Sequence, residues 1–157
     1  IYQDGLAAYD YLVHEKRIGP EKIVCFGRSL GAAVAMEIAL RRAVKALIVE
    51  SGFTSARDMA GEFLFFRPVS SLLPLHYNNL GKIAHVRAPK LIIHGTADDL
   101  VPFRMGQALY QSASDPKYFL PVKGAGHNDT CAVGGAHYFD VFVQFATTGR
   151  VGQKTKE

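Results

Sequence analysis

The stretch that most constrains this chain is residues 24–31, which read VCFGRSLG. It continues an apolar run from Ile23 to Phe26, as expected for a strand buried on both faces of a parallel sheet. Residues 31–42 have the periodicity and the Ala, Met, Glu and Leu content of a helix. Between strand and helix, the pattern G-x-S-x-G at residues 27–31 leaves room only for a very tight turn. The stretch therefore predicts a strand, a sharp turn that carries one serine, and a helix.

Ser29 is the side chain that such a turn presents. A serine hydroxyl is a weak nucleophile at neutral pH unless a base lies within hydrogen-bonding distance. A strand-to-helix turn lifts Oγ clear of the sheet and points backbone N–H groups, here that of Leu30, at the place where an oxyanion would form. We expect glycine at 27 and 31 because a Cβ at either position would collide with the turn or the facing strand. The alternative is a glycine-rich turn whose serine is incidental.

The rest of the chain alternates apolar strands with helical segments, which predicts an α/β fold: a parallel sheet with flanking helices. The expected strands are residues 22–27, 45–50, 90–94 and 118–122, and the expected helices are 2–16, 31–42, 102–113 and 134–146. Residues 56–87 are expected to form a helix, a bend and a short second helix. We expect one partial domain over residues 1–148 and a disordered polar tail over 149–157.

Candidate partners for Ser29 follow later strands of the predicted sheet. Functional sites of parallel sheets form outside the carboxyl ends of the strands, and Asp98 and His127 each follow such an end. His127 lies in a glycine-rich loop and is the expected base, although a loop histidine can also serve only the turn. Asp98 is the expected orienting acid, and the adjacent Asp99 is expected to point elsewhere. Glu50, at the end of the second strand, is a weaker candidate for the acid.

Further residues are candidates for a substrate pocket. The aromatic and leucine cluster at 63–75, which contains Phe65 and Phe66, either lines an acyl pocket, forms a lid or is ordinary core. Phe53, in the loop after the second strand, is a further possible pocket wall, and Arg28, inside the tight turn, is another candidate.

Charge and cysteine content narrow the function classes. The net charge is +4, but basic residues are scattered among acids, so we expect no nucleic-acid partner. Cys25 and Cys131 form no C-x-x-C pair, which gives little support to a metal site or a disulfide. No apolar run approaches the roughly 18 residues that span a bilayer. A membrane anchor is therefore expected only upstream of Ile1, which leaves a cytoplasmic or a membrane-associated location open.

The runs IVCFGRSLGAAVAMEIA, ESGFTS, HGTADDLVPF and GAGHND, in this order, resemble the alpha/beta hydrolase superfamily. The branch they resemble is often labelled serine aminopeptidase-like and includes protein depalmitoylases. The resemblance implies Ser29 as nucleophile, Asp98 as acid, His127 as base and the N–H of Leu30 as an oxyanion donor. The chain matches only the last four strands of the family's eight-stranded sheet. The missing N-terminal strands would supply the second oxyanion donor and cover the free edge of strand 22–27.

These observations lead to an expected function and its alternatives. We expect a serine hydrolase that cleaves a carboxylic ester or thioester, small or lipid-like, through an acyl-enzyme. Such chemistry needs no metal or organic cofactor. A peptidase or amidase of the same fold is the alternative within the class, and a non-catalytic interaction domain is the alternative outside it. Activity of this stretch alone is open, because the second oxyanion donor is expected upstream.

Overall fold

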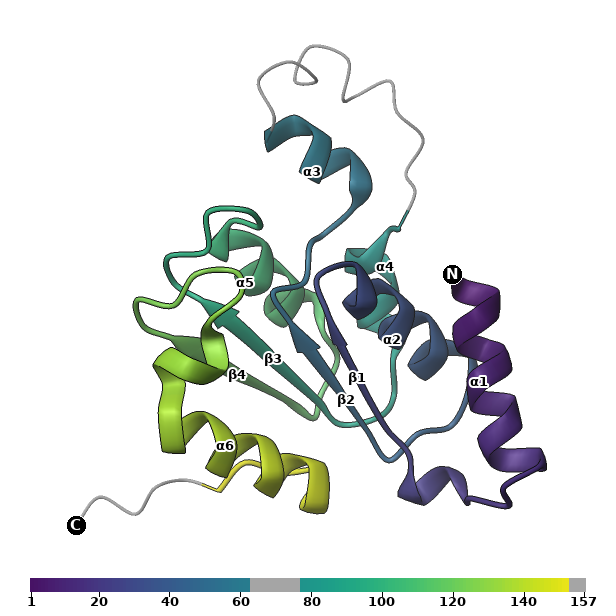
Figure 1. Ribbon diagram of the computed structural model, residues 1–157. Helices are drawn as coiled ribbons and strands as arrows, with labels where there is room; N and C mark the ends of the chain where they lie inside the picture. Colours follow the sequence, from purple (N-terminus) through teal and green to yellow (C-terminus); the bar gives the residue numbers. More distant parts are fainter. Residues whose placement is uncertain (63–76, 153–157) are drawn as a thin grey trace.

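The computed structural model describes residues 1–62 and 77–152. These residues form one sheet in the order β1-β2-β3-β4, and every neighbouring pair is parallel (Figure 1). The strands are β1 (Val24–Arg28), β2 (Ala46–Glu50), β3 (Lys90–Gly95) and β4 (Lys117–Val122). The parallel α/β fold predicted from the sequence is confirmed, and each strand lies within two residues of its predicted bounds.

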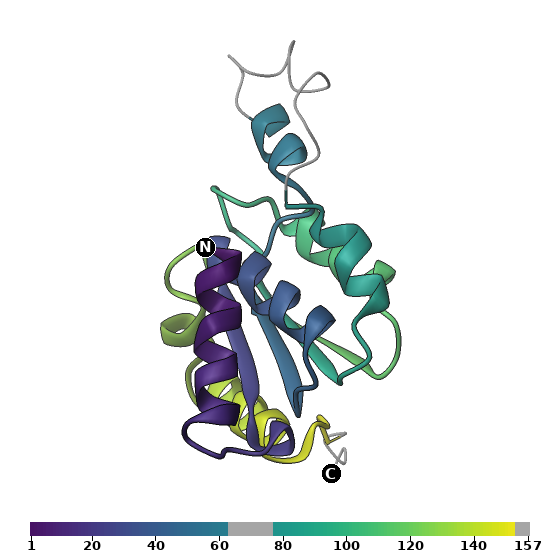
Figure 2. The same cartoon turned by 90° about the vertical axis from the view of Figure 1, so that its right-hand side faces the viewer.

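Helices cover both faces of this sheet. They are α1 (Tyr2–His14), α2 (Leu30–Arg41), α3 (Ala56–Glu62), α4 (Asn79–His85), α5 (Phe103–Ser112) and α6 (Thr130–Thr148), with a 3-10 turn at Pro20–Lys22. Helices α2, α4 and α5 share one core with the sheet, and α1 lies beside α2 in both ribbon views (Figures 1 and 2). Helix α6 packs on the opposite face. The described residues therefore form three layers.

The central strands are buried on both faces, as their unbroken apolar sequences predict. Every residue of β2 and β3 is buried. Leu47 and Val49 of β2 face the core that contains Met36 of α2, whereas Ile48 faces the core that contains Phe145 of α6. Successive side chains of a strand point to opposite faces, so the two cores lie on the two sides of one sheet.

Helix α6 differs from its predicted bounds because it is kinked. It begins at Thr130, four residues before the predicted start, and Gly135 within it has a φ of 52° and a ψ of −142°. It ends at Thr148, and the capping residue Gly149 has a left-handed φ of 70°. Gly152 N–H then donates to the Gln144 side chain. Residues 153–157 lie outside the described residues, so the disordered tail stays a prediction.

The segment between β2 and β3 holds the two expected helices, α3 and α4. Helix α3 stands at the end of the sheet where the strand arrows point (Figure 1). The side chain of Asn78 caps α4 by accepting the N–H of Gly81 at 3.0 Å. Residues 63–76 lie outside the described residues, and with them lie the pocket candidates Phe65 and Phe66.

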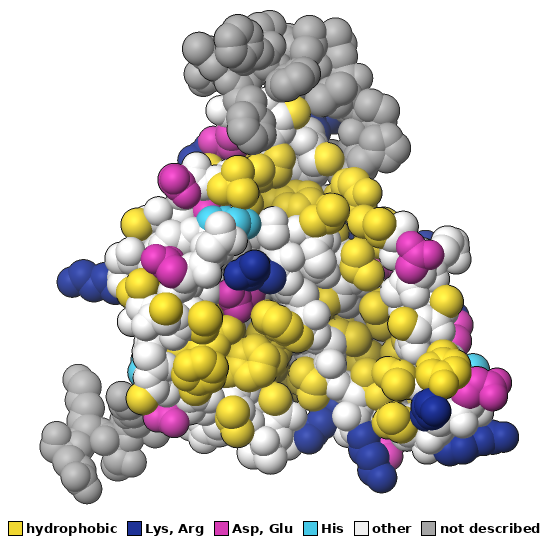
Figure 3. All heavy atoms as spheres, viewed as in Figure 1, with side chains coloured by type: hydrophobic (Ala, Val, Ile, Leu, Met, Phe, Trp, Pro, Cys, Tyr) yellow, Lys and Arg dark blue, Asp and Glu magenta, His cyan; other side chains and the backbone are white. Residues whose placement is uncertain are grey.

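Strand β1 is an edge of the sheet within the described residues and carries exposed apolar surface. Phe26 is 50% exposed, and its ring meets that of Phe142 on α6 edge-on at 5.3 Å. Phe139 and Val143 of α6 are also exposed. Figure 3 shows hydrophobic side chains gathered over this part of the molecule. Among the described helices, none has the length and hydrophobicity that crossing a bilayer requires.

Candidate functional site

The three candidate catalytic residues follow the carboxyl ends of three parallel strands. Ser29 comes directly after β1, Asp98 lies in the turn after β3, and His127 lies in the loop after β4. The carboxyl ends of parallel strands lie along the same side of a sheet, so all three segments come together there. The edge predicted from the sequence is therefore the edge where the structure places these residues.

The turn at Ser29 is strained. Ser29 has a φ of 52° and a ψ of −120°, which a non-glycine residue rarely adopts. Its N–H donates to the main-chain oxygen of Glu50 at 3.0 Å, which holds the turn on β2. A Cβ on Gly27 would lie 2.2 Å from the carbonyl oxygen of Gly31, so position 27 requires glycine. The same expectation for Gly31 is wrong, since a Cβ there would meet no described atom within 4 Å.

His127 and Asp98 are in direct contact. The Nδ1 of His127 lies 2.9 Å from Asp98 Oδ2 and 3.1 Å from Oδ1, and both residues are buried. Because the carboxylate accepts, Nδ1 carries the hydrogen of this bond, and it is Nε2 that has a lone pair whenever the ring is neutral. Oδ1 of Asp98 also accepts the N–H groups of Leu100 and Val101, which fix its orientation. Asp99 is exposed, so Asp98 is the member of the pair that orients the ring.

Ser29 and His127 both lie at the carboxyl ends of the strands, but no direct bond joins them. In the part of the chain that the structure describes, no hydrogen bond joins Ser29 Oγ to the His127 ring. Ser29 is partly exposed, whereas the ring of His127 is buried against Asp98. Catalytic hydrogen bonds of a free enzyme are often long and shorten only around the substrate. The arrangement thus supplies an oriented imidazole and, at the same edge, a hydroxyl on a strained turn.

His94 supports the turn that carries Asp98, a contact that sequence reasoning missed. It is fully buried, and its Nε2 donates to the carbonyl of Val101 at 2.9 Å, with Asp98 Oδ2 at 3.4 Å. Burial lowers the pKa of His94 by more than Val101 and Asp98 raise it, which favours the neutral ring. A Cβ on Gly106 would lie 2.4 Å from its Nδ1. The available signal was the position of His94, four residues before Asp98 at a strand end.

Among the described residues, the carboxylate of Glu50, the weaker candidate for the acid, is bonded to α6 and makes no hydrogen bond to His127. Its carboxylate is 3% exposed and accepts the hydroxyls of Thr130 at 2.5 Å and Tyr138 at 2.6 Å, both on α6. Burial, followed by the bond to this carboxylate, raises the pKa of Tyr138 well above its ordinary value. The histidine is bound to Asp98 and Glu50 to α6, so the arrangement favours Asp98 as the acid.

The remaining pocket candidates lie in different surroundings. Arg28 is exposed and lines a groove of about 590 Å³ together with Phe26, Tyr138 and Phe139. Phe53 is buried in a small core cluster that includes Val101. Within residues 1–62 and 77–152, no group of three or more His, Cys, Asp or Glu side chains is placed to hold a metal ion.

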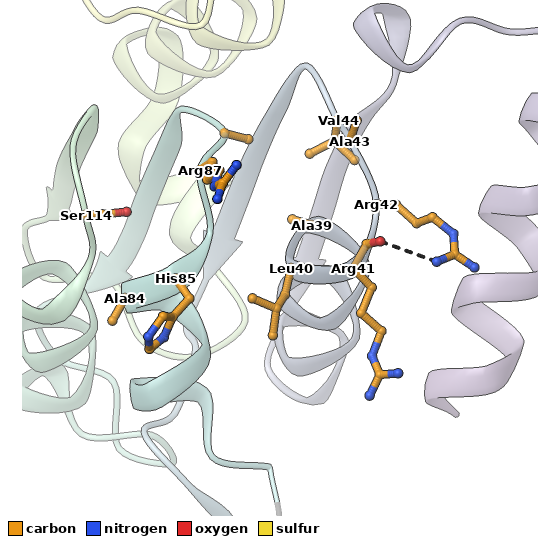
Figure 4. A pocket seen from close by; sticks show the side chains of 11 residues that line it. Ala39, Leu40, Arg41, Arg42, Ala43, Val44, Ala84, His85, Arg87 and Ser114 are labelled. Atoms are coloured by element: carbon orange, nitrogen blue, oxygen red, sulfur yellow. Dashed lines mark hydrogen bonds between the residues drawn. The ribbon is translucent and has the colours of Figure 1, made fainter.

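A groove of about 890 Å³ lies at the other end of α2, between its last turn and α4 (Figure 4). The groove is lined by apolar side chains and by four basic ones, which are Arg41, Arg42, His85 and Arg87. Arg41 is paired with Glu37, and Arg42 is paired with a carboxylate of α1 at 2.8 Å. Ser29 is at the opposite end of α2, so this groove is separate from the candidate site.

Comparisons with known proteins show which family the chain belongs to. The model of the prolyl oligopeptidase family matches residues 1–128. An uncharacterised protein of Mycobacterium tuberculosis is 38% identical over 151 residues, which are 96% of this chain and 54% of that protein. Human alpha/beta hydrolase domain-containing protein 17B is 33% identical over 147 residues, which are 94% of this chain and 49% of that protein.

Solved structures show the same fold. The esterase domain of a Rhodothermus marinus protein aligns with a TM-score of 0.72 at 21% identity, over 96% of this chain and 70% of that one. An acylaminoacyl peptidase of Pyrococcus horikoshii aligns with a TM-score of 0.79 at 18% identity, over 99% of this chain and 29% of that one. The chain spans about half the length of the curated relatives it matches. Because the family model covers most of the sequence, the chain belongs to the prolyl oligopeptidase family, within the alpha/beta hydrolase superfamily.

Proposed function

We propose that this protein is a serine hydrolase that cleaves a carboxylic ester or thioester. Ser29 is the nucleophile, His127 the general base and Asp98 the residue that orients His127. The observation that carries the proposal is the buried bond between Asp98 and His127 Nδ1, at the sheet edge where Ser29 lies on a strained turn. A base held by a carboxylate beside a serine is the arrangement that activates a hydroxyl.

The proposed reaction begins at the free Nε2 of His127. Nε2 takes the proton of Ser29 Oγ as that oxygen attacks the acyl carbonyl, and Asp98 stabilises the imidazolium. The N–H of Leu30, at the first position of α2, has no acceptor inside the helix and donates to the oxyanion. Collapse expels the alcohol or thiol, which takes the proton from His127. Water then attacks the acyl-enzyme through the same base and releases the acid and free Ser29.

Amide cleavage is the second candidate. Membership in the prolyl oligopeptidase family and the fold shared with an acylaminoacyl peptidase favour it. Esters and thioesters have better leaving groups than amides, so a peptidase also cleaves an activated ester, and turnover of the amide itself separates the two. Turnover of an acyl thioester or p-nitrophenyl ester without measurable turnover of the corresponding peptide p-nitroanilide supports the ester proposal, and efficient turnover of the anilide favours amide cleavage. A non-catalytic domain would turn over neither.

The test of the nucleophile is Ser29→Ala in the intact protein, probed with a fluorophosphonate, which phosphonylates activated serines and releases fluoride. We expect labelling of the wild type and its loss in the variant. Ser112→Ala, on α5, is the matched control and should label like wild type. His127→Ala should slow labelling by about a hundredfold or more. Labelling of Ser29→Ala at the wild-type rate would overturn the proposal.

A further inference from the structure

Glu50 is bonded to both halves of the candidate site, through its main chain and its side chain. Its carbonyl oxygen accepts the N–H of Ser29 at 3.0 Å, and its carboxylate accepts Thr130 and Tyr138 at 2.5 and 2.6 Å. Among the hydrogen bonds of residues 1–62 and 77–152, no other residue bonds both to Ser29 and to the segment from His127 to Tyr138.

The bond to Thr130 holds the start of α6 and, with it, the loop that carries the histidine. Thr130 is the first residue of α6 and lies three positions after His127. Within the loop, Gly126 N–H donates to Asp129 at 2.7 Å, and upstream of it Ala97 N–H donates to Ala125 O at 2.9 Å. The loop is thus anchored to the turn after β3 on one side and to β2, through Glu50, on the other.

The bond to Tyr138 lies beyond the kink of the helix. Gly135, with its non-helical backbone, separates Thr130 from Tyr138, so one carboxylate holds both parts of α6. Tyr138 is eleven positions from His127, whereas Thr130 adjoins the loop. Loss of the Thr130 bond frees the end next to the histidine, and loss of the Tyr138 bond frees the far part of the helix.

We propose that Glu50 is a positioning residue that sets the placement of His127 relative to Ser29. This inference rests on the proposed serine hydrolase function. The main chain of Glu50 fixes the nucleophile turn, and its carboxylate fixes the loop of the base through Thr130. Since β2 is fully buried, one residue of a packed strand links the turn of the nucleophile to the loop of the base. A small displacement of a base from its nucleophile slows proton transfer without weakening substrate binding.

The test compares Thr130→Val with Tyr138→Phe in the intact protein, because each variant removes one hydroxyl donor from the same carboxylate. For Thr130→Val we expect a fall of about tenfold or more in kcat and in the fluorophosphonate labelling rate, with KM unchanged. For Tyr138→Phe we expect a lower urea midpoint but kcat within about threefold of wild type. Glu50→Gln, which keeps one oxygen acceptor, should retain more kcat than Glu50→Ala.

Equal effects of Thr130→Val and Tyr138→Phe on kcat, or none from Thr130→Val, would show that Glu50 is only structural. A second readout needs no substrate: the downfield proton resonance of His127 Nδ1 should exchange faster with solvent in Thr130→Val than in Tyr138→Phe. Equal exchange would also overturn the inference. Wild-type activity that survives Ser29→Ala would instead reject the proposed function, and the exchange measurement would still decide the role of Glu50 in placing His127.

Discussion

At the scale of single residues, the turn at Ser29 depends on one glycine more than on the other. The G-x-S-x-G pattern treats Gly27 and Gly31 alike, but their surroundings differ. Gly27, the residue before the last of β1, lies against the first turn of α2, where its missing Cβ makes room for the backbone of Gly31. Gly31 is exposed and lies inside α2 with open space at its Cβ position. The packing of the described residues therefore requires glycine at position 27 but not at position 31.

This difference predicts opposite effects of the same substitution. Gly27→Ala places a methyl group against backbone that cannot move, and we expect a loss of about 3 kcal/mol in the free energy of unfolding. Gly31→Ala lowers the backbone entropy of the unfolded chain, and the folded position is helical and exposed. We therefore expect a gain of about 0.5 kcal/mol in the free energy of unfolding. Urea unfolding of both variants beside the wild type measures the two values. A Gly27→Ala variant as stable as wild type would contradict the steric argument.

At the scale of elements, a buried carboxylate joins three helices. Glu37 of α2 is 3% exposed and pairs with Lys82 Nζ of α4 at 2.5 Å and with Arg41 of its own helix. Lys82 also donates to the hydroxyl of Tyr2 on α1 at 2.7 Å. Burial alone would raise the pKa of Glu37, but the bonds from Lys82 and Arg41 outweigh it and hold that pKa below its ordinary value.

Removal of one partner should cost more than replacement of both. For Lys82→Met we expect a loss of about 2 kcal/mol at neutral pH, since Arg41 still compensates part of the charge of Glu37. Glu37→Leu combined with Lys82→Met should recover most of that loss, because an apolar pair leaves no uncompensated charge. Urea unfolding of the two single variants and the double variant gives the coupling energy. A double variant no more stable than Lys82→Met would refute the explanation.

The same pair gives a pH dependence of known sign. The pKa of Glu37 is lower in the folded state than its ordinary 4.5, so its contribution to stability is present above that pH. It is lost as the pH falls through the folded-state value. The destabilisation by Lys82→Met should therefore be largest near neutral pH and shrink in acid. Urea midpoints measured along a pH series check the trend, which reverses if the carboxylate is not stabilised by its partners.

At the scale of the whole molecule, β1 is an edge strand of the described sheet and has exposed apolar side chains beside it. An edge strand exposes unpaired backbone groups, and apolar side chains beside it favour association with another strand or chain. Phe26 of β1 and the α6 residues Phe139 and Val143 are each about half exposed or more.

This surface predicts self-association of the 157-residue chain. We expect sedimentation velocity to show oligomers whose fraction rises with concentration, because burial of Phe26, Phe139 and Val143 between two chains removes apolar surface from water. Lys in place of both Phe139 and Val143 should shift the chain toward monomer. Tyr11→Lys, at an exposed site on α1, is the matched control and should leave the distribution unchanged. A wild-type chain that stays monomeric would contradict this reading of the edge.

The sequence by itself determined the elements and their order. Unbroken apolar runs predict buried parallel strands because such strands have no polar face, and the places of Ser29, Asp98 and His127 after the strand ends follow from that pattern. It also indicated Asp98 ahead of Asp99. These features depend on neighbours within a few residues, which is the range over which periodicity and turn chemistry act.

Only the tertiary structure decided which side chains of different elements contact one another. The carboxylate of Glu50 meets Thr130 and Tyr138 across 80 and 88 positions of sequence, and no local pattern specifies such a pair. The shared support of Asp98 by His94 and His127, and the open space at Gly31, are decided in the same way. Side-chain contacts form where the sheet and the helices pack. They depend on distances between residues far apart in the chain, and local sequence patterns do not specify those distances.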